Sequence, residues 1–552
     1  QLLNGTVIKD ANGKKLTGTH KSIDYFFDFL DAYDFASEGS EEIQEDNKTL
    51  INASVLGLIF EKINGYKDGS FYTPSFITMY MCKETIRRAV VQKFNETKDW
   101  NCEDFDALYN KIEDTKEANA IINSVKICDP AVGSGHFLVS ALNEMIAIKH
   151  DLKVLVDREG KRLKEYQVDI VNDELIVTDE DGLPFTYNPK SKESQRLQET
   201  LFHEKQTIIE NCLFGVDINP NSVKICRLRL WIELLKNAYY TSEGELQTLP
   251  NIDINIKCGN SLVSRFGLKD SLKSVFKNKE IEYSIEDYKI AVNEYKQTNS
   301  KSKKREVSDI IKTVKSNFKT NLDSKIKDKV SKASGDYENE KQRLDNLELF
   351  GEKTKKTETD NLKKLKLKAE KITKEKDDIL NNVIYKDAFE WRFEFPEVLD
   401  NEGNYLGFDV IIGNPPYIQL QKMGTSSDVL QQLNYLTFAR TGDIYSLFYE
   451  LGNNILKKKG LLIFITSNKW MRAAYGESLR KYFVDHTNPL ILIDFAGVQI
   501  FDSATVDTNI LMFSKDKNRQ QTKACIIKEK VLNNLSLYFE QQLEISSFYS
   551  SE

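Results

Sequence analysis

The chain has 552 residues, of which 40% are hydrophobic and 29% charged, so it can bury a large core and global disorder is excluded. At roughly 150 residues per domain, we expect two to four domains. The net charge of -7 predicts no global attraction to polyanions, but the charge is uneven. Residues 301–380 hold 23 of the 77 Lys and Arg and 16 of the 84 Asp and Glu, a local charge of +7, which leaves -14 for the remainder. Any polyanion contact is therefore expected from local patches.

Cysteine and apolar patterns indicate the compartment. The seven cysteines form no CxxC pair, and several lie in apolar runs, which predicts small core residues in a reducing environment. The five histidines show no metal-ligand spacing, so no metal site is expected. No apolar run approaches ~18 residues, and the start of the chain does not resemble a signal peptide. We expect a soluble, cytoplasmic protein without a membrane segment.

The first part of the chain is predicted to be helical. Residues 20–63 carry apolar side chains at helical spacing, which defines an expected N-terminal helical region over residues 1–70. After a polar turn, Tyr72, Thr73 and Pro74 precede a second apolar stretch. Proline at the first turn and a hydroxyl beside it favour a helix start there, with Thr73 available as a cap.

From residue 125 onward, the pattern changes to strand, turn and helix in repetition, which predicts an α/β fold with a parallel sheet. The expected core covers residues 71–265 and 382–520, with an insertion of hairpin character at about 151–199. Residues 521–552 form a C-terminal segment that we expect to lead to a target-recognition domain absent from this chain.

The second insertion, residues 266–381, is rich in Lys and Glu and free of proline. It predicts long amphipathic helices, an arm or a helical hairpin, with breaks at 331–336 (SKASGD) and 350–353 (FGEK). A solvated pair of charged helices is favoured over a surface for phosphate contact.

Three strand ends carry residues suited to a nucleotide-like ligand. The turn 129–137 (DPAVGSGHF) joins a strand to a helix, and its glycines let the backbone approach a ligand at the helix N-terminus. It lacks the third glycine of the dinucleotide fingerprint. Asp217 ends a second strand, where it can accept ribose hydroxyls while Ile218 covers a base; Asn260 and Ser261 end a third and can contact an adenine edge.

A fourth apolar run, FDVIIG, is stopped by Asn414-Pro415-Pro416-Tyr417. The prolines remove backbone donors, so a free Pro415 carbonyl beside the Asn414 amide offers two acceptors to one planar NH2 group. This arrangement suits the methylation of an exocyclic amine. A Pro-rich turn without chemistry is the alternative for the tetrapeptide alone.

Together these motifs resemble the N6-adenine DNA methyltransferases of restriction–modification systems, in the large Eco57I-like, NPPY class that includes fused type IIG enzymes. The resemblance covers nearly the whole chain, through YTP, DPAVGSGHF, GVDINP, CGNSL, FEWRFEFPEV, GNPPYI and ITSNKW. It implies a Rossmann-like sheet that uses S-adenosyl-L-methionine (SAM), with a seventh, antiparallel strand, an N-terminal helical region and a long helical insertion.

The resemblance also implies residue roles. The methyl donor is held at its carboxylate by Thr73 in the Tyr72-Thr73-Pro74 motif, and at its methionine end by the turn that follows the first strand. Asn414 and the Pro415 carbonyl accept from the target N6, and Tyr417 and Phe501 stack on the flipped base. Ala504 stands where some relatives have a cation. The implied cofactor contacts are Tyr72, Thr73, Pro74, Asp129, Pro130, Ala131, Gly133, Gly135, Asp217, Ile218, Asn260 and Ser261; the implied catalytic residues are Asn414, Pro415, Pro416 and Tyr417.

The implied partners are double-stranded DNA and a target-recognition domain or specificity subunit. Alternatives stay open: a methyltransferase of protein glutamine or ribosomal RNA, the methylase part of a fused restriction endonuclease, or a non-enzymatic assembly subunit. No PD-(D/E)xK nuclease pattern is found in the chain. The recognition sequence, the oligomeric state and the choice between type IIG, phage-exclusion and type I-like systems are not predicted.

Overall fold

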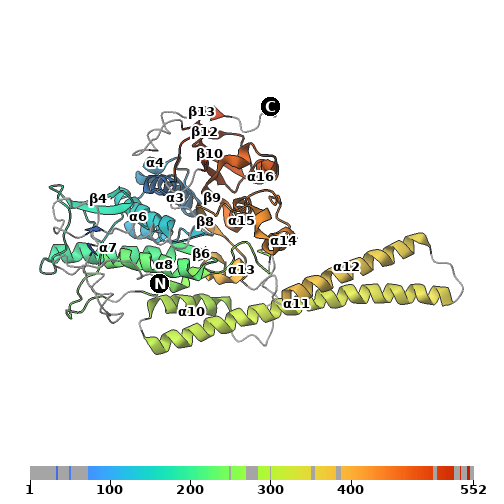
Figure 1. Ribbon diagram of the computed structural model, residues 1–552. Coiled ribbons are helices and arrows are strands. Elements are labelled where there is room, and N and C mark those ends of the chain that lie inside the picture. The colour runs from blue at the N-terminus through green and yellow to red at the C-terminus, as the bar shows by residue number, and fades with distance from the viewer. Residues whose placement is uncertain are drawn as a thin grey trace, which may run out of the picture.

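The computed structural model consists of a body built on one sheet and a pair of long helices that project from it (Figure 1). The described residues are 73–247, 250–265, 267–268, 284–298, 300–349, 355–380, 387–501 and 506–527, with short pieces at 33–34, 49–50, 535 and 544–546. Tyr72 and Ala504 lie outside them.

Within the described residues, nine strands form the central sheet in the order β7-β6-β3-β8-β9-β11-β10-β12-β13. The strands are β3 (Ile127–Asp129), β6 (Leu213–Asp217), β7 (Ile256–Cys258), β8 (Phe408–Gly413), β9 (Leu456–Ser467), β10 (Asn488–Asp494), β11 (Thr508–Ser514), β12 (Thr522–Ile526) and β13 (Glu544–Ser546). The first five in this order are parallel, whereas β11 runs antiparallel to both β9 and β10. The first seven form the predicted Rossmann-like methyltransferase sheet with its seventh, antiparallel strand.

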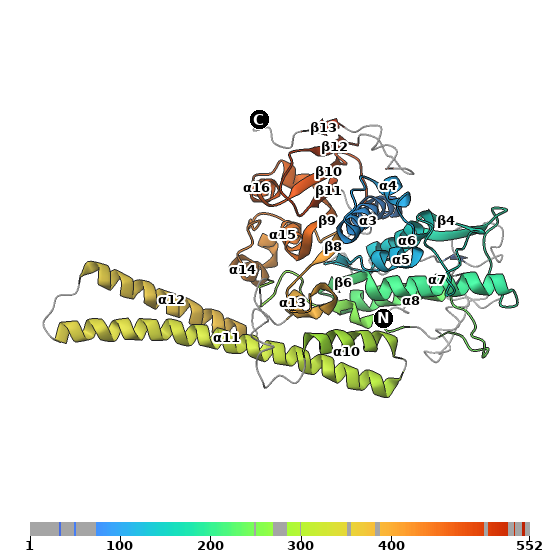
Figure 2. The ribbon, with the colours of Figure 1, turned by 180° about the vertical axis from the view of Figure 1, so that it is seen from behind.

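Helices cover both faces of the sheet (Figure 2). The helices of the described residues, the projecting α11 and α12 included, are α3 (Ser75–Lys98), α4 (Phe105–Tyr109), α5 (Thr115–Ile122), α6 (His136–Asp151), α7 (Lys192–Asn211), α8 (Pro220–Leu235), α10 (Ile285–Gln297), α11 (Lys301–Leu349), α12 (Lys356–Leu380), α13 (Trp391–Glu394), α14 (Thr425–Gln432), α15 (Tyr445–Ile455) and α16 (Glu477–His486). None of the described helices is long and apolar enough to cross a membrane.

Strand β9 shows why the sheet needs two covered faces. Its apolar run is buried residue after residue, and alternate side chains of a strand point to opposite faces. Ile463 and Ile465 belong to the core on the α3 and α6 side, whereas Leu462 and Phe464 belong to the core with α15 and α16. A continuous apolar strand is therefore stable only between two helical layers.

The described N-terminal part is helical from Ser75 onward, as the fold prediction requires. Thr73 does not cap this helix: Pro74 is the N-cap residue, without a side-chain hydrogen bond. Of residues 20–63, only Tyr33–Asp34 and Thr49–Leu50 are described, and they pair as short parallel strands where helix is predicted at most of these positions. Pairing between segments far apart in the chain overrides the local helical spacing there.

The first insertion contains the predicted hairpin. Strands β4 (Tyr166–Val171) and β5 (Glu174–Asp179) pair antiparallel, and Asn172 and Asp173 between them both have positive φ, as a two-residue hairpin turn requires. The turn reaches α6, where the Asp173 carboxylate lies 2.8 Å from His136 Nε2 and accepts from the Ser140 hydroxyl at 2.6 Å.

The second insertion forms α10, α11 and α12, but the predicted break at 331–336 is wrong. Helix α11 runs unbroken through this segment to Leu349. A single exposed glycine costs a helix only about 1 kcal/mol, and packing against α12 offsets it. Ala333 and Ala369 are 5% and 8% exposed, so small side chains let the two helices approach closely.

Two ion pairs fix the base of this insertion to the body. Lys296 of α10 lies 2.7 Å from Glu397, and Lys315 of α11 lies 2.6 Å from Glu394. Both glutamates belong to the segment that precedes β8, and Phe395 between them is 1% exposed. The family-typical FEFPEV segment therefore anchors the insertion beside the sheet.

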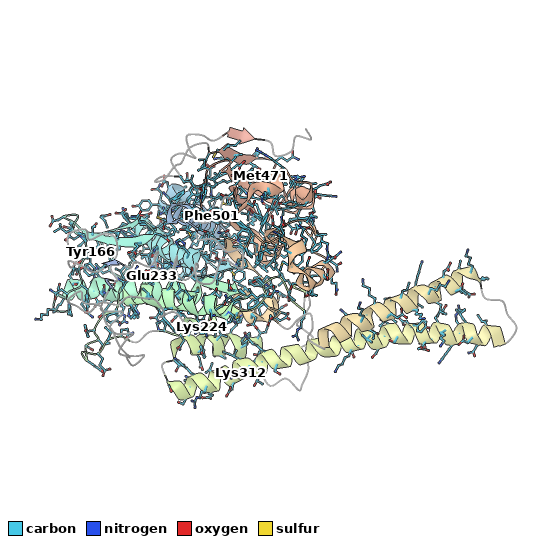
Figure 3. All side chains as sticks on the ribbon, viewed as in Figure 1. Tyr166, Lys224, Glu233, Lys312, Met471 and Phe501 are labelled. Carbon is cyan, nitrogen blue, oxygen red and sulfur yellow. The ribbon has the colours of Figure 1, made fainter. Side chains whose placement is uncertain are left out.

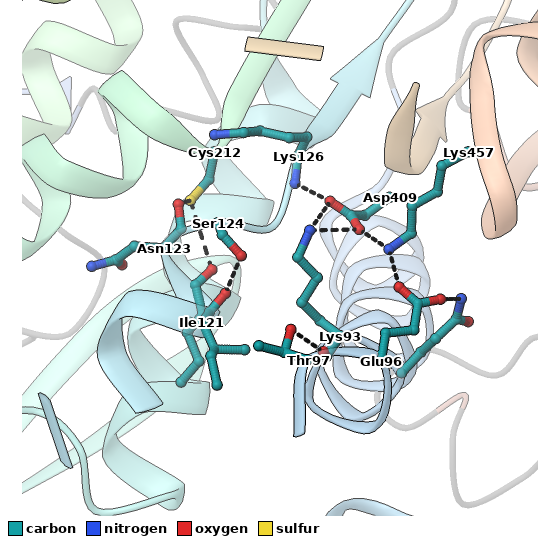
Figure 4. A network of polar contacts seen from close by, with 12 residues as sticks. Lys93, Glu96, Thr97, Ile121, Asn123, Ser124, Lys126, Cys212, Asp409 and Lys457 are labelled. Carbon is teal, nitrogen blue, oxygen red and sulfur yellow. Dashed lines mark hydrogen bonds and ion pairs between the residues drawn. The ribbon is translucent and has the colours of Figure 1, made fainter. Parts of the chain in front are cut away.

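At the amino end of β8, the Asp409 carboxylate joins four elements of the body (Figure 4). It is 2% exposed, accepts from the backbone N–H of Lys126 at 2.7 Å, and pairs with Lys93 Nζ at 3.2 Å and with Lys457 Nζ. Lys93 lies on α3, Lys126 precedes β3 and Lys457 lies on β9. One buried anion thus sets the relative position of α3 and the three central strands.

Asp409→Ala should lower the stability of the fold by about 3 kcal/mol, because two cations and a backbone N–H lose their buried acceptor. Chemical denaturation followed by tryptophan fluorescence measures the effect. The control is Asp309→Ala, which removes an exposed pair with Lys312 on α11 and should cost under about 0.5 kcal/mol. Equal small effects of both substitutions would contradict the structural role of Asp409.

Candidate cofactor and substrate site

The four predicted turns lie at one edge of the sheet. They follow β7, β6, β3 and β8, which are consecutive neighbours in the sheet and parallel, so their carboxyl ends meet. In open α/β sheets this edge is where ligands bind. The fold therefore brings together residues that are up to 341 positions apart in the chain.

The glycine-rich turn after β3 is held by hydrogen bonds to β6. The Gly133 N–H donates to Asp217 Oδ2 at 2.9 Å, and the Val132 N–H donates to the Val216 carbonyl at 3.0 Å. Gly135 has φ +83°, and a Cβ there would meet Cys226 Sγ at 2.5 Å. Nothing lies within 4 Å of the Cβ that Gly133 lacks, so this turn exposes its backbone.

Asp129 is buried where β3 and β8 meet. Its carboxylate accepts from the Ala131 N–H at 2.9 Å, and a Cβ on Gly413 would lie 2.7 Å from Asp129 Oδ1. Burial raises the pKa of Asp129 to about 8, against the opposing hydrogen bond from Ala131 and with a smaller contribution from repulsion by Asp217. Because Gly413 has no side chain, the turn after β3 can lie in contact with the residue directly before Asn414.

Asp217 ends β6 and organises two turns. Besides accepting from Gly133, its carboxylate accepts from the Asn219 N–H at 2.7 Å, and Asn219 caps α8. Ile218 beside it is 60% exposed, an unusual value for isoleucine, and offers an apolar surface at this edge.

The residues after β7 join the turn after β3. The Ser261 hydroxyl donates to the Pro130 carbonyl at 2.6 Å, and Ser261 is 5% exposed. Asn260 Oδ1 accepts from the Leu262 N–H at 3.1 Å, and its backbone pairs with Ala388. In this structure both side chains shape the turn itself.

Thr73 contacts the residue predicted to be catalytic. Asn414 Nδ2 donates to Thr73 Oγ1 at 3.1 Å, and Thr73 is 3% exposed. Sequence reasoning assigned these residues to separate motifs and missed their contact. Because the amide nitrogen is turned toward Thr73, the amide oxygen of Asn414 is directed to a different side. Pro415 is buried and Pro416 half-buried directly after it.

Tyr417 and Phe501 lie side by side, with ring centroids 6.2 Å apart. The Tyr417 hydroxyl donates to the Ile465 carbonyl at 3.1 Å, which fixes the ring, and burial raises its pKa. Phe501 is 1% exposed and lies inside the body, far from Lys312 on α11 (Figure 3). In this conformation Phe501 supports Tyr417 and offers little surface to a base.

One supporting residue carried no sequence signal. Arg229 of α8 is 4% exposed and donates to Ser134 Oγ at 3.2 Å and to the Ser134 carbonyl at 3.4 Å. It holds the glycine-rich turn from behind. From the sequence alone, an arginine of an amphipathic helix that supports a buried turn cannot be told apart from one that is exposed to solvent.

Comparison with known proteins identifies the family. The model of the Eco57I restriction-modification methylase family matches residues 211–501, so the chain belongs to this family. A domain of unknown function, DUF7814, matches residues 1–51.

Individual relatives are similar over different shares of the chain. A Methanocaldococcus jannaschii protein, named as a type II restriction enzyme and methyltransferase, is 28% identical over 98% of this chain and 44% of its own length. The type II restriction enzyme and methyltransferase RM.Eco57I of Escherichia coli is 32% identical over 20% of this chain and 11% of its own. The type II methyltransferase M.BanIII of Aneurinibacillus aneurinilyticus is 32% identical over 24% of each. The chain thus spans less than half the length of these relatives.

Among solved structures, the type IIL restriction-modification enzyme MmeI in complex with DNA is similar with a TM-score of 0.40 at 12% identity. The likeness covers 88% of this chain and 42% of that one.

Asp129→Asn should stabilise the protein at pH 8 relative to wild type, by about 1–3 kcal/mol, and leave stability unchanged near pH 4. The raised pKa means that the folded state keeps this proton between about pH 4 and 8 while the unfolded state has lost it. Wild-type stability therefore falls relative to the variant over this range. Denaturation of both proteins at several pH values measures the difference, and a pH-independent difference would contradict the buried, protonated carboxyl.

Gly135→Ala should destabilise the protein by about 2 kcal/mol or more and distort the turn after β3, since the new Cβ meets Cys226 at a left-handed φ. The matched control is Gly335→Ala, where a Cβ enters open space within α11 and should stabilise the helix by about 1 kcal/mol. Thermal unfolding of both variants gives the comparison; destabilisation by both would show that the contact with Cys226 is not the cause.

Proposed function

We propose that the chain is the methyltransferase part of a restriction–modification or phage-defence system and transfers a methyl group from SAM to N6 of adenine in double-stranded DNA. The observation that carries the proposal is the hydrogen bond from Asn414 to Thr73, which orients an amide acceptor beside the buried Asp129 turn. Family membership supports the reaction class, since the family is one of restriction-modification methylases.

The residues present fit the donor. Gly133 exposes its backbone, Thr73 supplies a hydroxyl, and the Asp129 carboxyl lies at the same strand end, so these groups would hold the methionine moiety by hydrogen bonds. Asp217 with Ile218 suits the ribose and a face of the adenine, with Asn260 and Ser261 at the adenine edge. When bound, SAM supplies an electrophilic methyl group on a sulfonium.

The acceptor side follows from hydrogen-bond chemistry. Asn414 Oδ1 and the Pro415 carbonyl accept the two N–H bonds of the target amine, which holds its nitrogen lone pair toward the donor site. Tyr417 stacks on the base, and Phe501 keeps Tyr417 in place. This nitrogen would receive the methyl group from the donor that Thr73, Asp129 and Gly133 would hold, and the amine would then lose a proton to solvent. Positioning and electrostatics supply the rate enhancement.

The target adenine must leave the duplex to reach a buried strand edge. Extrusion costs a few kcal/mol, and stacking on Tyr417 recovers about 1–3 kcal/mol. Since a ring held by its hydroxyl loses little freedom on binding, the hydrogen bond to Ile465 favours this stacking.

The proposal also assigns a role to each part of the chain. Residues 71–265 and 382–520 form the methyltransferase core, 266–381 an appended helical insertion, and 521–552 lead toward a target-recognition domain or specificity subunit. Two relatives named as restriction enzyme and methyltransferase are longer than this chain, which supports a methylase part of a fused enzyme. The expected location is the cytoplasm, where the DNA is.

Asn414→Ala should reduce methyl transfer at least 10³-fold while SAM affinity changes less than about threefold, because the amide acts on the acceptor. Transfer of a labelled methyl group to duplex DNA, with N6-methyladenine identified in the product, measures the first quantity, and calorimetry the second. Asn339→Ala, on the exposed face of α11, is the matched control and should leave both unchanged.

Duplex DNA, ribosomal RNA and a glutamine-containing release factor are offered as separate acceptors. Methylation of the RNA or the protein in place of DNA would overturn the acceptor assignment, and full activity of Asn414→Ala would overturn the catalytic one.

A further inference from the structure

The two helices of the projecting arm differ in charge. Residues 327–347 of α11 hold five Lys and Arg and five Asp and Glu, so this stretch is balanced. Residues 355–374, which include most of α12, hold eight Lys and three Asp and Glu. Charges that only keep a helix pair soluble can be mixed equally on both helices. Solubility therefore does not require that one helix carry more positive charge than the other.

The excess charge lies on one side of α12. Leu362, Leu365 and Ala369 are partly or fully buried on the side that faces α11, where Glu358 also pairs with Arg343 at 3.0 Å. On the opposite side the side chains are exposed. The lysines of this outer face are Lys356, Lys363, Lys364, Lys371 and Lys374. We call these five residues the α12 lysine stripe.

Four of the five stripe lysines, Lys356, Lys363, Lys364 and Lys374, take part in none of the ion pairs among the described residues, whereas the neighbouring Lys366 lies 3.9 Å from Glu370. Lys371 and Lys374 lie one turn apart, where like charges repel each other, whereas Lys356 and Lys364 each lie one turn from the exposed Asp360. A polyanion along the stripe would remove this repulsion.

We infer that the α12 lysine stripe binds the phosphate backbone of duplex DNA, independent of base sequence. The inference rests on the proposed function, which supplies duplex DNA as the substrate. From Lys356 to Lys374 the helix rises about 27 Å, comparable to one B-DNA turn of about 34 Å, so a straight helix can follow a duplex over most of a turn. Lysine on a flexible stem suits phosphate contact without base reading.

The arm is placed to extend the footprint of the body. It projects well beyond the sheet in both views of the ribbon (Figures 1 and 2), and its base is fixed by the pairs of Lys296 with Glu397 and Lys315 with Glu394. In the inference, the stripe is a second contact for duplex DNA, outside the body and away from the target adenine. This contact supplies affinity and leaves the choice of adenine to other parts.

The test removes four stripe charges at once, in Lys356→Gln, Lys363→Gln, Lys364→Gln and Lys374→Gln. The matched control removes four exposed charges from α11, in Lys327→Gln, Lys329→Gln, Lys332→Gln and Lys341→Gln, so both variants have the same net charge. Fluorescence anisotropy with a labelled duplex of about 30 base pairs gives Kd between 50 and 200 mM salt, and circular dichroism checks helix content.

We expect the stripe variant to bind DNA about tenfold more weakly at 100 mM salt, with a slope of log K against log salt that is smaller by 2–4. The control should stay within twofold of wild type. Equal affinities and slopes for the two variants would overturn the inference and leave the stripe as a solvated face of the arm. SAM affinity, measured in parallel, should not change.

Failure of the function and failure of this inference give different results. If wild type binds duplex DNA through the stripe but transfers no methyl group to it, the proposed function is wrong and the inference about the α12 lysine stripe is supported. If wild type methylates DNA, and both variants bind and methylate DNA as wild type does, the inference about the stripe is wrong and the proposed function is supported.

Discussion

The close approach of β3 and β8 is the constraint on which the candidate site depends. The Asp129 carboxylate lies against the backbone of Gly413, where any Cβ would come within 2.7 Å. This contact joins the turn that suits the methyl donor to the residue before Asn414. It also buries a carboxyl group and raises its pKa to about 8, so the fold gives up stability to keep an acid at this place.

Around this contact, short polar links connect segments that are far apart in the chain. Asn414 donates to Thr73, Ser261 donates to the Pro130 carbonyl, and the Gly133 N–H donates to Asp217. The first link joins the NPPY segment to the residue before the N-cap of α3, and the other two join the turns after β7 and β6 to the turn after β3. The predicted cofactor and catalytic motifs therefore lie beside one another, with the contact between Asp129 and Gly413 between the two sets of hydrogen bonds.

The helical insertion shows what composition can and cannot decide. Its Lys and Glu content and lack of proline predicted long helices, and α10, α11 and α12 are present. The break at 331–336 was wrong because packing of Ala333 against α12 outweighs the cost of Gly335. The one-sided charge of α12 appears only when its buried side is known, because exposed and buried positions cannot be assigned before the partner helix is.

The sequence by itself determined the strand ends, the glycine turn, the NPPY segment and the order of the motifs, because apolar runs, glycine and proline act locally. The order predicted the parallel sheet, which the observed pairing of β7, β6, β3, β8 and β9 confirms. Only the tertiary structure decided that Thr73 holds Asn414 instead of capping a helix, that Arg229 supports the glycine turn, and that Phe501 is buried behind Tyr417. These contacts join residues tens to hundreds of positions apart, and no local preference encodes which distant partner a side chain meets.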